Sequence, residues 1–340
     1  AVNKSTNEKY STIQEAINAA GDGDTIEVLK DIRTILCNEI PESKNITIDL
    51  KGNNIKNYMN KSYITNKGTL EIKDSGKGEE DSKTYGKIEN TSGIAISNSG
   101  NLKINNIIIN AENNDVIVNN DSGKIEIINS SISTSSFSKN VIKNNDVGEI
   151  IISSGTIKST GGNSAHVITN SGTGKIVVNG GNIILSRYGF EEEAIINASS
   201  GTIEVNGGTI ESSSLGNKGI ENKGSGKIII NDGEISAYYG GIYNSSTGEV
   251  EINGGKIKSI NNSGLLTMKS GTITSGISNS QSGQATITGG TISGGISNSG
   301  TLNIGEKDGT VSKENPIITG NNYGVVNNSG TFNFYDGTIK

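Results

Sequence analysis

Residues 220–235 read Ile-Glu-Asn-Lys-Gly-Ser-Gly-Lys-Ile-Ile-Ile-Asn-Asp-Gly-Glu-Ile, and variants of this stretch recur along most of the chain. Each copy has an apolar residue, an asparagine two places later, a turn of small residues and a short strand pattern. The apolar residue and its asparagine occur at Ile64–Asn66, Ile96–Asn98, Ile117–Asn119, Ile142–Asn144, Ile168–Asn170, Ile195–Asn197, Ile220–Asn222, Ile242–Asn244, Ile260–Asn262, Ile277–Asn279, Ile296–Asn298 and Val326–Asn328. From Asn98 onward the asparagines are 17 to 30 residues apart. A period of this length without a helical pattern predicts stacked turns of β-strand, which is a solenoid.

Apolar and polar positions alternate in the strand part of each copy. Leu102-Lys-Ile104 and Val250-Glu-Ile252 are examples, and this alternation places two side chains in a core and the middle one in solvent. A further apolar residue follows five places later, as Ile257 follows Ile252. Glycine suits the intervening corner because such corners often require positive φ. With the residue before the asparagine, each turn has three inward positions, so we expect a three-faced coil.

Isoleucine dominates the inward positions, and its β-branched side chain favours stacked strands over helices. The repeated asparagine has two interpretations. Either the stacked side-chain amides form a hydrogen-bonded ladder at one corner, or the asparagines only shape turns. Neither arrangement implies catalysis.

A helix followed by a first strand is predicted near the N-terminus. Residues 10–28 read Tyr-Ser-Thr-Ile-Gln-Glu-Ala-Ile-Asn-Ala-Ala-Gly-Asp-Gly-Asp-Thr-Ile-Glu-Val. One face of the helix would be apolar and is formed by Ile13, Ala16, Ile17 and Ala20. Ser11 or Thr12 would cap its start. Such a helix would close the open apolar end of the coil, as terminal elements of solenoids must.

The repeats and this N-terminal segment resemble the pectin-lyase-like right-handed parallel β-helix superfamily, in particular a bacterial surface adhesin-like member. The resemblance implies an all-β fold: a right-handed single-stranded parallel β-helix with three faces and a short N-terminal capping α-helix. We expect residues 1–24 to form the N-terminal segment with the helix, and residues 25–340 to form one continuous β-helix domain. The last strand pattern has no capping element behind it, so we expect the chain to be cut from a longer protein at its C-terminus.

Composition argues against several classes of partner. The formal net charge is −6 and basic residues are scattered singly, so we expect no nucleic-acid partner. No apolar stretch approaches the ~18–20 residues of a membrane span, so we expect no membrane insertion. Cys37 is the single cysteine, which precludes an intrachain disulfide, and its neighbours Ile35 and Leu36 predict a buried thiol. Lysine greatly outnumbers arginine, and Asn and Ile abound, which fits an AT-rich bacterial genome. The absence of a disulfide then fits the exterior of a Gram-positive bacterium, so we expect a secreted or cell-surface protein.

Loop insertions concentrate on one edge of the coil, in residues 184–243. Constant parts of a repeat build the scaffold, whereas insertions usually carry function. When the repeats are aligned on the residue after the corner, side chains suited to a sugar ring fall on this edge: Arg187, Tyr188, Ser213, Tyr238, Tyr239 and Tyr243. We predict ligand binding by these six residues. The alternative is that the tyrosines only cover loop backbone.

The acidic run Glu191–Glu193 lies in the same edge. Three consecutive acids could bind calcium through carboxylate oxygens, but solvation or pairing with Arg187 is the favoured explanation. We therefore predict no metal site and no cofactor.

Catalysis is the main competing hypothesis, because the resembled family includes polysaccharide lyases, glycoside hydrolases and pectin esterases. Glu204 and Glu251 share the outward strand stripe but lie about 10 Å apart, at or beyond the ~6.5–9.5 Å of inverting carboxylate pairs. The Gly-His-Gly motif of the family hydrolases is missing, and His166, the only histidine, has no acid and nucleophile at recognisable spacing. We predict no catalytic residues.

The leading hypothesis is a non-catalytic β-helix that acts as an adhesin or rigid stalk and binds glycan or a host or other extracellular protein along the 184–243 edge. One alternative is a carbohydrate-active enzyme whose acids are brought together by loops, for example Glu191–Glu193 with Glu221 or Asp232. Another is a purely structural array without a ligand. The sequence leaves the oligomeric state open.

Overall fold

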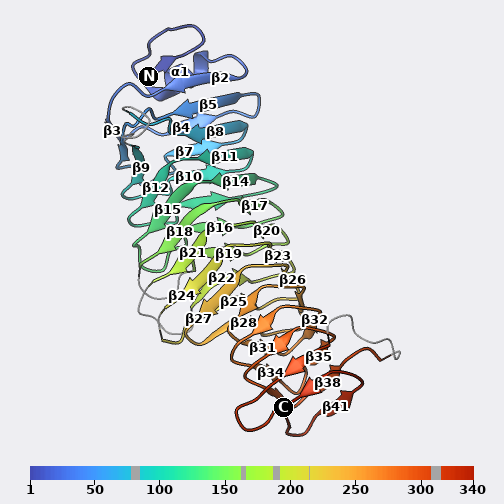
Figure 1. The fold of residues 1–340 in the computed structure, drawn as a ribbon. Coiled ribbons are helices and arrows are strands. Elements are labelled where there is room, and N and C mark those ends of the chain that lie inside the picture. Colours follow the sequence, from blue (N-terminus) through green and yellow to red (C-terminus); the bar gives the residue numbers. More distant parts are fainter. Residues whose placement is uncertain (78–84, 162–165, 187–191, 214, 308–314) are drawn as a thin grey trace. The chain divides into compact units, whose positions relative to one another are not determined.

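The computed structural model describes residues 1–77, 85–161, 166–186, 192–213, 215–307 and 315–340. They form two compact units, Ala1–Thr169 and Asn170–Lys340. In each unit, short parallel strands build three sheets around a common core, and from β2 onward successive strands of the chain belong to different sheets (Figure 1). The predicted all-β, right-handed parallel β-helix with one short helix is therefore confirmed.

Helix α1 (Ile13–Ala19) lies near the start of the first unit, as predicted. Thr12 caps it: its side-chain oxygen accepts a hydrogen bond from the Glu15 amide, and the Glu15 carboxylate accepts one from the Thr12 amide. Ile13, Ala16 and Ile17 are buried, and the helix packs near the first strands of the coil. An unpredicted strand, β1 (Val2–Asn3), pairs antiparallel with β2 (Asp24–Glu27).

The three sheets are named A, B and C, and their strands in the first unit are as follows. Sheet A contains β1, β2, β5 (Asn45–Asp49), β8 (Thr69–Lys73), β11 (Asn101–Asn105), β14 (Lys124–Ile128) and β17 (Glu149–Ile152). Sheet B contains β3 (Ile32–Thr34), β6 (Ile55–Asn57), β9 (Lys87–Asn90), β12 (Ile108–Ala111), β15 (Ser130–Thr134) and β18 (Gly155–Ser159). Sheet C contains β4 (Asn38–Ile40), β7 (Ile64–Asn66), β10 (Ile96–Asn98), β13 (Ile117–Asn119) and β16 (Ile142–Asn144), and β19 (Ile168–Asn170) spans the boundary between the units.

The second unit repeats this plan. Its sheet A contains β20 (Lys175–Val178), β23 (Thr202–Val205), β26 (Lys227–Ile230), β29 (Glu249–Ile252), β32 (Leu265–Met268), β35 (Gln284–Ile287), β38 (Thr301–Ile304) and β41 (Thr331–Phe334). Its sheet B contains β21 (Asn182–Leu185), β24 (Thr209–Ser212), β27 (Glu234–Ala237), β30 (Lys256–Ile257), β33 (Thr272–Ile273), β36 (Thr291–Ile292), β39 (Ile317–Ile318) and β42 (Thr338–Ile339). Its sheet C contains β22 (Glu193–Asn197), β25 (Lys218–Asn222), β28 (Gly240–Asn244), β31 (Ile260–Asn262), β34 (Ile277–Asn279), β37 (Ile296–Asn298) and β40 (Val325–Asn327).

Aliphatic side chains stack in register inside each coil. Ile104, Ile127 and Ile152 pair across neighbouring strands of sheet A and are fully buried. The sequence pattern missed a fourth inward position, directly before the apolar residue of each repeat. Both residues are buried in Tyr63–Ile64, Ala95–Ile96, Val116–Ile117, Val141–Ile142, Val167–Ile168 and Ala194–Ile195. Two consecutive buried residues break the alternation that a regular strand would show.

The repeated asparagines form a buried ladder in each unit. The side-chain amide nitrogen of each donates to the side-chain oxygen of the next, at 2.7–2.8 Å from Asn66 to Asn144 and 2.7–3.2 Å from Asn170 to Asn327. All but the last are at most 1% exposed. Of the two interpretations, the ladder is therefore confirmed.

The ladder also explains a recurring glycine that follows the asparagine. At Gly226, an added Cβ would lie 2.2 Å from the Asn197 amide nitrogen and 2.2 Å from the Gly201 carbonyl oxygen. The asparagine of one turn thus occupies the space above the glycine of the next turn. Glycine is required here because stacked turns approach each other closely. Positive φ is not the reason, since Gly226 does not have one.

Two sequence expectations are wrong in detail. The last repeat is Val325–Asn327, one residue earlier than predicted, because Val325 pairs with Ile296 and Asn327 continues the ladder from Asn298. The doubled Val-Val-Asn-Asn at 325–328 fits either register in sequence. Cys37 is only partly buried, since Ile35 and Leu36 beside it are exposed.

Candidate functional site

The residue before each ladder asparagine forms an outward column along sheet C of the second unit. In register, this column contains Ile196, Glu221, Tyr243, Asn261, Ser278, Ser297 and Val326. Paired strands lie ~4.8 Å apart, so each side chain is a direct neighbour of the next. Beyond Tyr243 the column consists of small polar residues, and bulk returns only at Val326. A depression between two bulkier ends follows from this order.

A groove of about 550 Å³ lies over the small part of the column. Tyr239 and Tyr243 line it at one end, and Tyr323 and Val326 at the other. Its floor includes the small residues Ser259, Asn261, Ser275, Gly276, Ser278 and Gly295. No charged side chain lines the groove within the described part of the chain. The volume is within the ~300–1,000 Å³ typical of ligand sites, and we call this feature the sheet C groove.

Two glycines keep the floor of the sheet C groove low. Gly276 and Gly295 have φ of 96° and 75°, which side chains rarely tolerate. A Cβ on Gly276 would lie 2.6 Å from the Gly295 carbonyl oxygen, and one on Gly295 would lie 2.8 Å from the Tyr323 carbonyl oxygen. Both backbone geometry and space therefore exclude larger residues.

The two tyrosines at one end of the groove are held together. The rings of Tyr239 and Tyr243 stack with centroids 6.3 Å apart and planes inclined by 22°. The Tyr243 hydroxyl donates to the Tyr239 carbonyl oxygen at 3.3 Å, and the Lys218 ammonium lies 4.9 Å from the Tyr243 ring centroid. The Tyr239 side chain remains 64% exposed. The pair therefore presents a supported aromatic surface to a ligand.

Beneath Tyr243 lies a buried charged cluster, formed by Glu193, Lys218, Glu221 and Lys223. The Lys218 ammonium is 3.3 Å from Glu193 and 2.8 Å from Glu221, and the Lys223 ammonium is 3.5 and 3.4 Å from the same two carboxylates. Ser245 donates its hydroxyl hydrogen to Glu221 at 2.6 Å. We call these four charged residues the Lys218 cluster.

The environment of the Lys218 cluster separates its acids from solvent. The Glu193 and Glu221 side chains are 0% and 4% exposed. Burial, followed by the neighbouring Glu193 carboxylate, raises the pKa of Glu221, although Lys218 and Ser245 oppose this rise. Neither carboxylate lines the sheet C groove, so the cluster fits a support for Tyr243 better than a catalytic pair.

The predicted binding residues are distributed in three ways. Arg187 and Tyr188 lie outside the described residues. Tyr239 and Tyr243 are brought together, as described. The Tyr238 ring instead faces Lys258: the Lys258 ammonium lies 5.5 Å from the centroid of the Tyr238 ring and donates to the Tyr238 carbonyl oxygen. Ser213 is exposed, directly after β24.

Sequence reasoning missed the far half of the site. Tyr323 was not considered, and neither were the serines and glycines of the floor or the role of Lys218. The signal that could have found them is the outward residue before each asparagine, read as a column from Tyr243 to Val326. The length variation of the repeats pointed to the loop edge instead.

The outward acids of sheet A do not form a catalytic pair. Glu204 and Glu251 lie two strands apart with Ile229 between them, as predicted. Lys227 and Lys269 lower the pKa of Glu251 to about 2, and Lys175, 2.7 Å away, lowers the pKa of Glu204. A general acid needs a raised pKa, so neither residue suits that role at neutral pH.

The other acids of the enzyme hypothesis are placed as follows. Glu191 lies outside the described residues, whereas Glu193 and Glu221 meet in the Lys218 cluster. The Asp232 carboxylate accepts a hydrogen bond from the Gly233 amide at a corner after β26. Within the described ranges, no group of three or more His, Cys, Asp or Glu side chains is arranged to hold a metal ion. Among the residues that the structure describes, no helix is long and apolar enough to span a bilayer.

Comparison with family models, with curated protein sequences and with solved structures finds no match for this chain.

Proposed function

We propose that the chain is a non-catalytic β-helix that binds neutral glycan chains in the sheet C groove. The observation that carries this proposal is an open, uncharged groove with tyrosines at both ends and hydroxyl and amide groups on its floor. The C–H faces of sugar rings pack on aromatic rings, and their hydroxyls exchange hydrogen bonds with serine and asparagine side chains. A neutral lining offers no cation to pair with the carboxylate of an acidic sugar.

The length of the groove supports a polymeric ligand. From β28 to β40 there are four strand-to-strand steps of ~4.8 Å, so the site extends roughly 19 Å. This is longer than a single sugar ring, and the small floor residues put no barrier across it. We infer that several linked sugars lie along the column, with the outer ones against Tyr239 and Tyr323.

A wider biological role is based on the fold and the composition of the chain. We propose membership of the pectin-lyase-like β-helix superfamily, with a role as a surface adhesin or stalk of a Gram-positive bacterium. The repeat architecture, the N-terminal capping helix and the lysine-rich composition support it. A glycan site on the side of a solenoid suits adhesion, because the repeats display it on an extended surface.

A carbohydrate-active enzyme is the second candidate. One observation favours it: Glu193 and Glu221 meet, and the pKa of Glu221 is raised, as the pKa of a general acid must be. Their burial and their lysine partners weigh against it. Incubation with neutral and acidic polysaccharides, followed by an assay for reducing and unsaturated ends, distinguishes the two functions. Product release abolished by Glu221→Gln would establish the enzyme.

The double substitution Tyr239→Ala/Tyr243→Ala is expected to weaken binding of a neutral hexasaccharide about tenfold, because it removes one aromatic end of the groove. The measurement is calorimetric titration with cellohexaose, mannohexaose and chitohexaose, using whichever of them binds the unmodified protein. Tyr58→Ala is the matched control, since Tyr58 is also partly exposed with a lysine, Lys56, 5.8 Å from its ring centroid, but lies in the first unit.

Equal affinities for the double variant and the control would place the ligand elsewhere. Preferential binding of oligogalacturonate over all three neutral probes would contradict the neutral-glycan assignment. Circular dichroism verifies that the variants keep their β-structure.

A further inference from the structure

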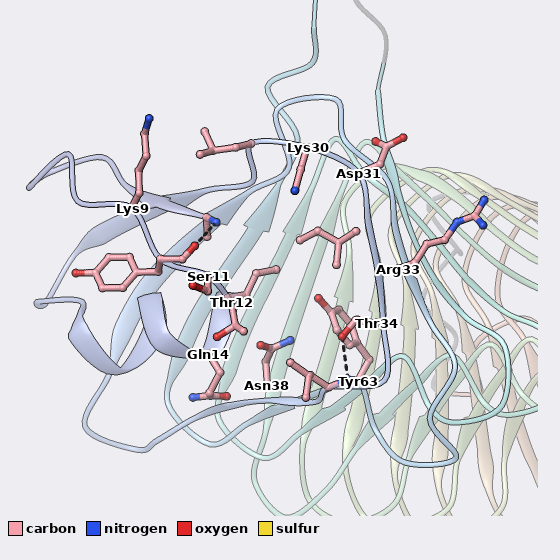
Figure 2. Close-up of a pocket in the computed structure, with 16 residues that line it drawn as sticks. Lys9, Ser11, Thr12, Gln14, Lys30, Asp31, Arg33, Thr34, Asn38 and Tyr63 are labelled. Carbon is pink, nitrogen blue, oxygen red and sulfur yellow. Dashed lines mark hydrogen bonds between the residues drawn. The ribbon is translucent and has the colours of Figure 1, made fainter.

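A second cavity, of about 700 Å³, lies in the first unit beside helix α1. It opens between the N-terminal segment, residues 9–14, and the loop and strand of residues 29–36 (Figure 2). Asn38 and Tyr63, which are 5% and 1% exposed, form its deepest part. The glycan proposal makes no use of this cavity, which we call the α1 pocket.

One wall of the α1 pocket is aliphatic. Ile13, Leu29, Ile32 and Leu36 line it, and Leu29 and Leu36 are 51% and 52% exposed. Exposed leucines beside a concave surface gain hydrophobic free energy when an apolar group covers them. The wall therefore favours a ligand with an apolar body.

The inner end of the α1 pocket is polar but uncharged. Thr34, Asn38 and Tyr63 line it. Burial raises the pKa of Tyr63, and a hydrogen bond with the Asn38 side chain opposes this rise, so the phenol stays protonated at neutral pH. These groups can exchange hydrogen bonds with a polar atom of the ligand.

Positively charged groups outnumber negatively charged ones around the pocket. Lys9, Lys30 and Arg33 line it, and the side chains of these three make no ion pair among the described residues. Ala1 also lines the pocket, and its ammonium donates to the Tyr10 carbonyl oxygen at 3.0 Å. Asp31, the one acid in the lining, accepts a hydrogen bond from the Asn54 amide at 2.8 Å, and this bond lowers the pKa of its carboxyl. Figure 2 shows Lys30 reaching over the pocket, whereas Lys9 and Arg33 extend away from it.

We propose that the α1 pocket binds a small amphipathic carboxylate, whose charged group pairs with Lys30 and whose apolar body lies on the aliphatic wall. The Lys30 side chain is exposed and has no carboxylate partner in the described part of the protein, so a ligand carboxylate can replace its water with a charge-assisted hydrogen bond. A neutral apolar molecule would leave the ammonium without a partner. A small hydrophilic anion would leave the exposed leucines uncovered.

Three probes separate these contributions: octanoate has the tail and the charge, octanamide has the tail alone, and acetate has the charge alone. Calorimetric titration of the full chain should show one octanoate bound per chain, with octanamide about tenfold weaker and acetate below detection. Added salt should weaken octanoate but not octanamide. Equal affinity for octanoate and octanamide, or no octanoate binding at millimolar concentration, would overturn the proposal.

Substitutions locate the site. Lys30→Met keeps most of the length of the side chain but removes its charge, so octanoate should bind about as weakly as octanamide while octanamide binding is unchanged. Leu36→Ser should weaken both probes. Lys9→Met is the matched control and should change neither, because Lys9 extends away from the pocket (Figure 2). Lys9, Lys30 and Leu36 are all exposed, so we expect the three variants to fold. Undiminished octanoate binding by Lys30→Met would refute the assignment.

Discussion

Replacing Lys218 with methionine is expected to lower the free energy of unfolding by about 3 kcal/mol at pH 8. The substitution leaves Glu193 and Glu221, at 0% and 4% exposed, without their closest cation. Breaking a buried ion pair typically costs 3–5 kcal/mol, and we expect about the lower limit because Lys223 remains 3.5 Å or less from both acids. Chemical denaturation followed by circular dichroism measures the loss.

The loss caused by Lys218→Met should depend on pH. The folded-state pKa of Glu221 is raised, so its contribution to stability is fully present below the unfolded value of ~4.3 and falls as pH rises through the folded value. Removal of the Lys218 ammonium raises the folded-state pKa of Glu221 further, so Glu221 stays protonated up to a higher pH. The variant should therefore lose more stability at pH 8 than at pH 5, where a carboxyl can take up a proton.

Lys223→Met is the matched control for the Lys218 cluster. Lys223 contacts the same two carboxylates, but its side chain is 46% exposed against 14% for Lys218. Exposed ion pairs contribute roughly 0–1 kcal/mol, so a small loss is expected. Equal losses for the two lysine variants, or a Lys218→Met loss that is independent of pH, would contradict the description of the cluster as buried and coupled.

Asn222→Ala is expected to destabilise the second unit by about 3 kcal/mol. The Asn222 amide donates to Asn244 at 3.2 Å and to the Gly226 carbonyl, and its side-chain oxygen accepts from Asn197 at 3.1 Å. Alanine leaves the buried Asn244 oxygen without a donor, and each such orphaned group costs about 1–3 kcal/mol in addition to the space that is left. Urea denaturation measures the change.

An exposed asparagine ladder provides the control for Asn222→Ala. Asn206 donates to Asn179 at 2.9 Å and accepts from Asn231 at 2.7 Å, at a corner open to water. Water can replace these bonds, so Asn206→Ala should cost about 0.5 kcal/mol or less. A similar cost at Asn206 and Asn222 would mean that burial of the ladder does not determine its contribution.

Most of the fold was predictable because local rules repeat. Each turn places isoleucine, asparagine and glycine at fixed offsets, so the same physical reason operates many times. The exceptions are places where sequence offers two equivalent choices. At Val325-Val-Asn-Asn328 both registers satisfy the pattern, and only pairing with Ile296 and Asn298 selects one.

The site was harder to predict because it depends on contacts between turns. Tyr239 and Tyr243 were recognised as aromatic residues near a loop edge, but their stacking and their support by Lys218 arise from register. Tyr323 is 80 residues from Tyr243 and meets the same groove because four strand steps separate their turns. Small residues such as Ser278 carry no signal alone and become a floor only as a column.

Mapping of amide chemical shifts during titration with a neutral hexasaccharide tests the central claim most directly. We predict that perturbed amides concentrate along the sheet C groove, at Ser259, Asn261, Ser278, Ser297 and Tyr323, while amides of sheet A and of the first unit stay unchanged. Perturbations concentrated on sheet A, or no perturbation by any of cellohexaose, mannohexaose and chitohexaose at millimolar concentration, would contradict a neutral-glycan site in this groove.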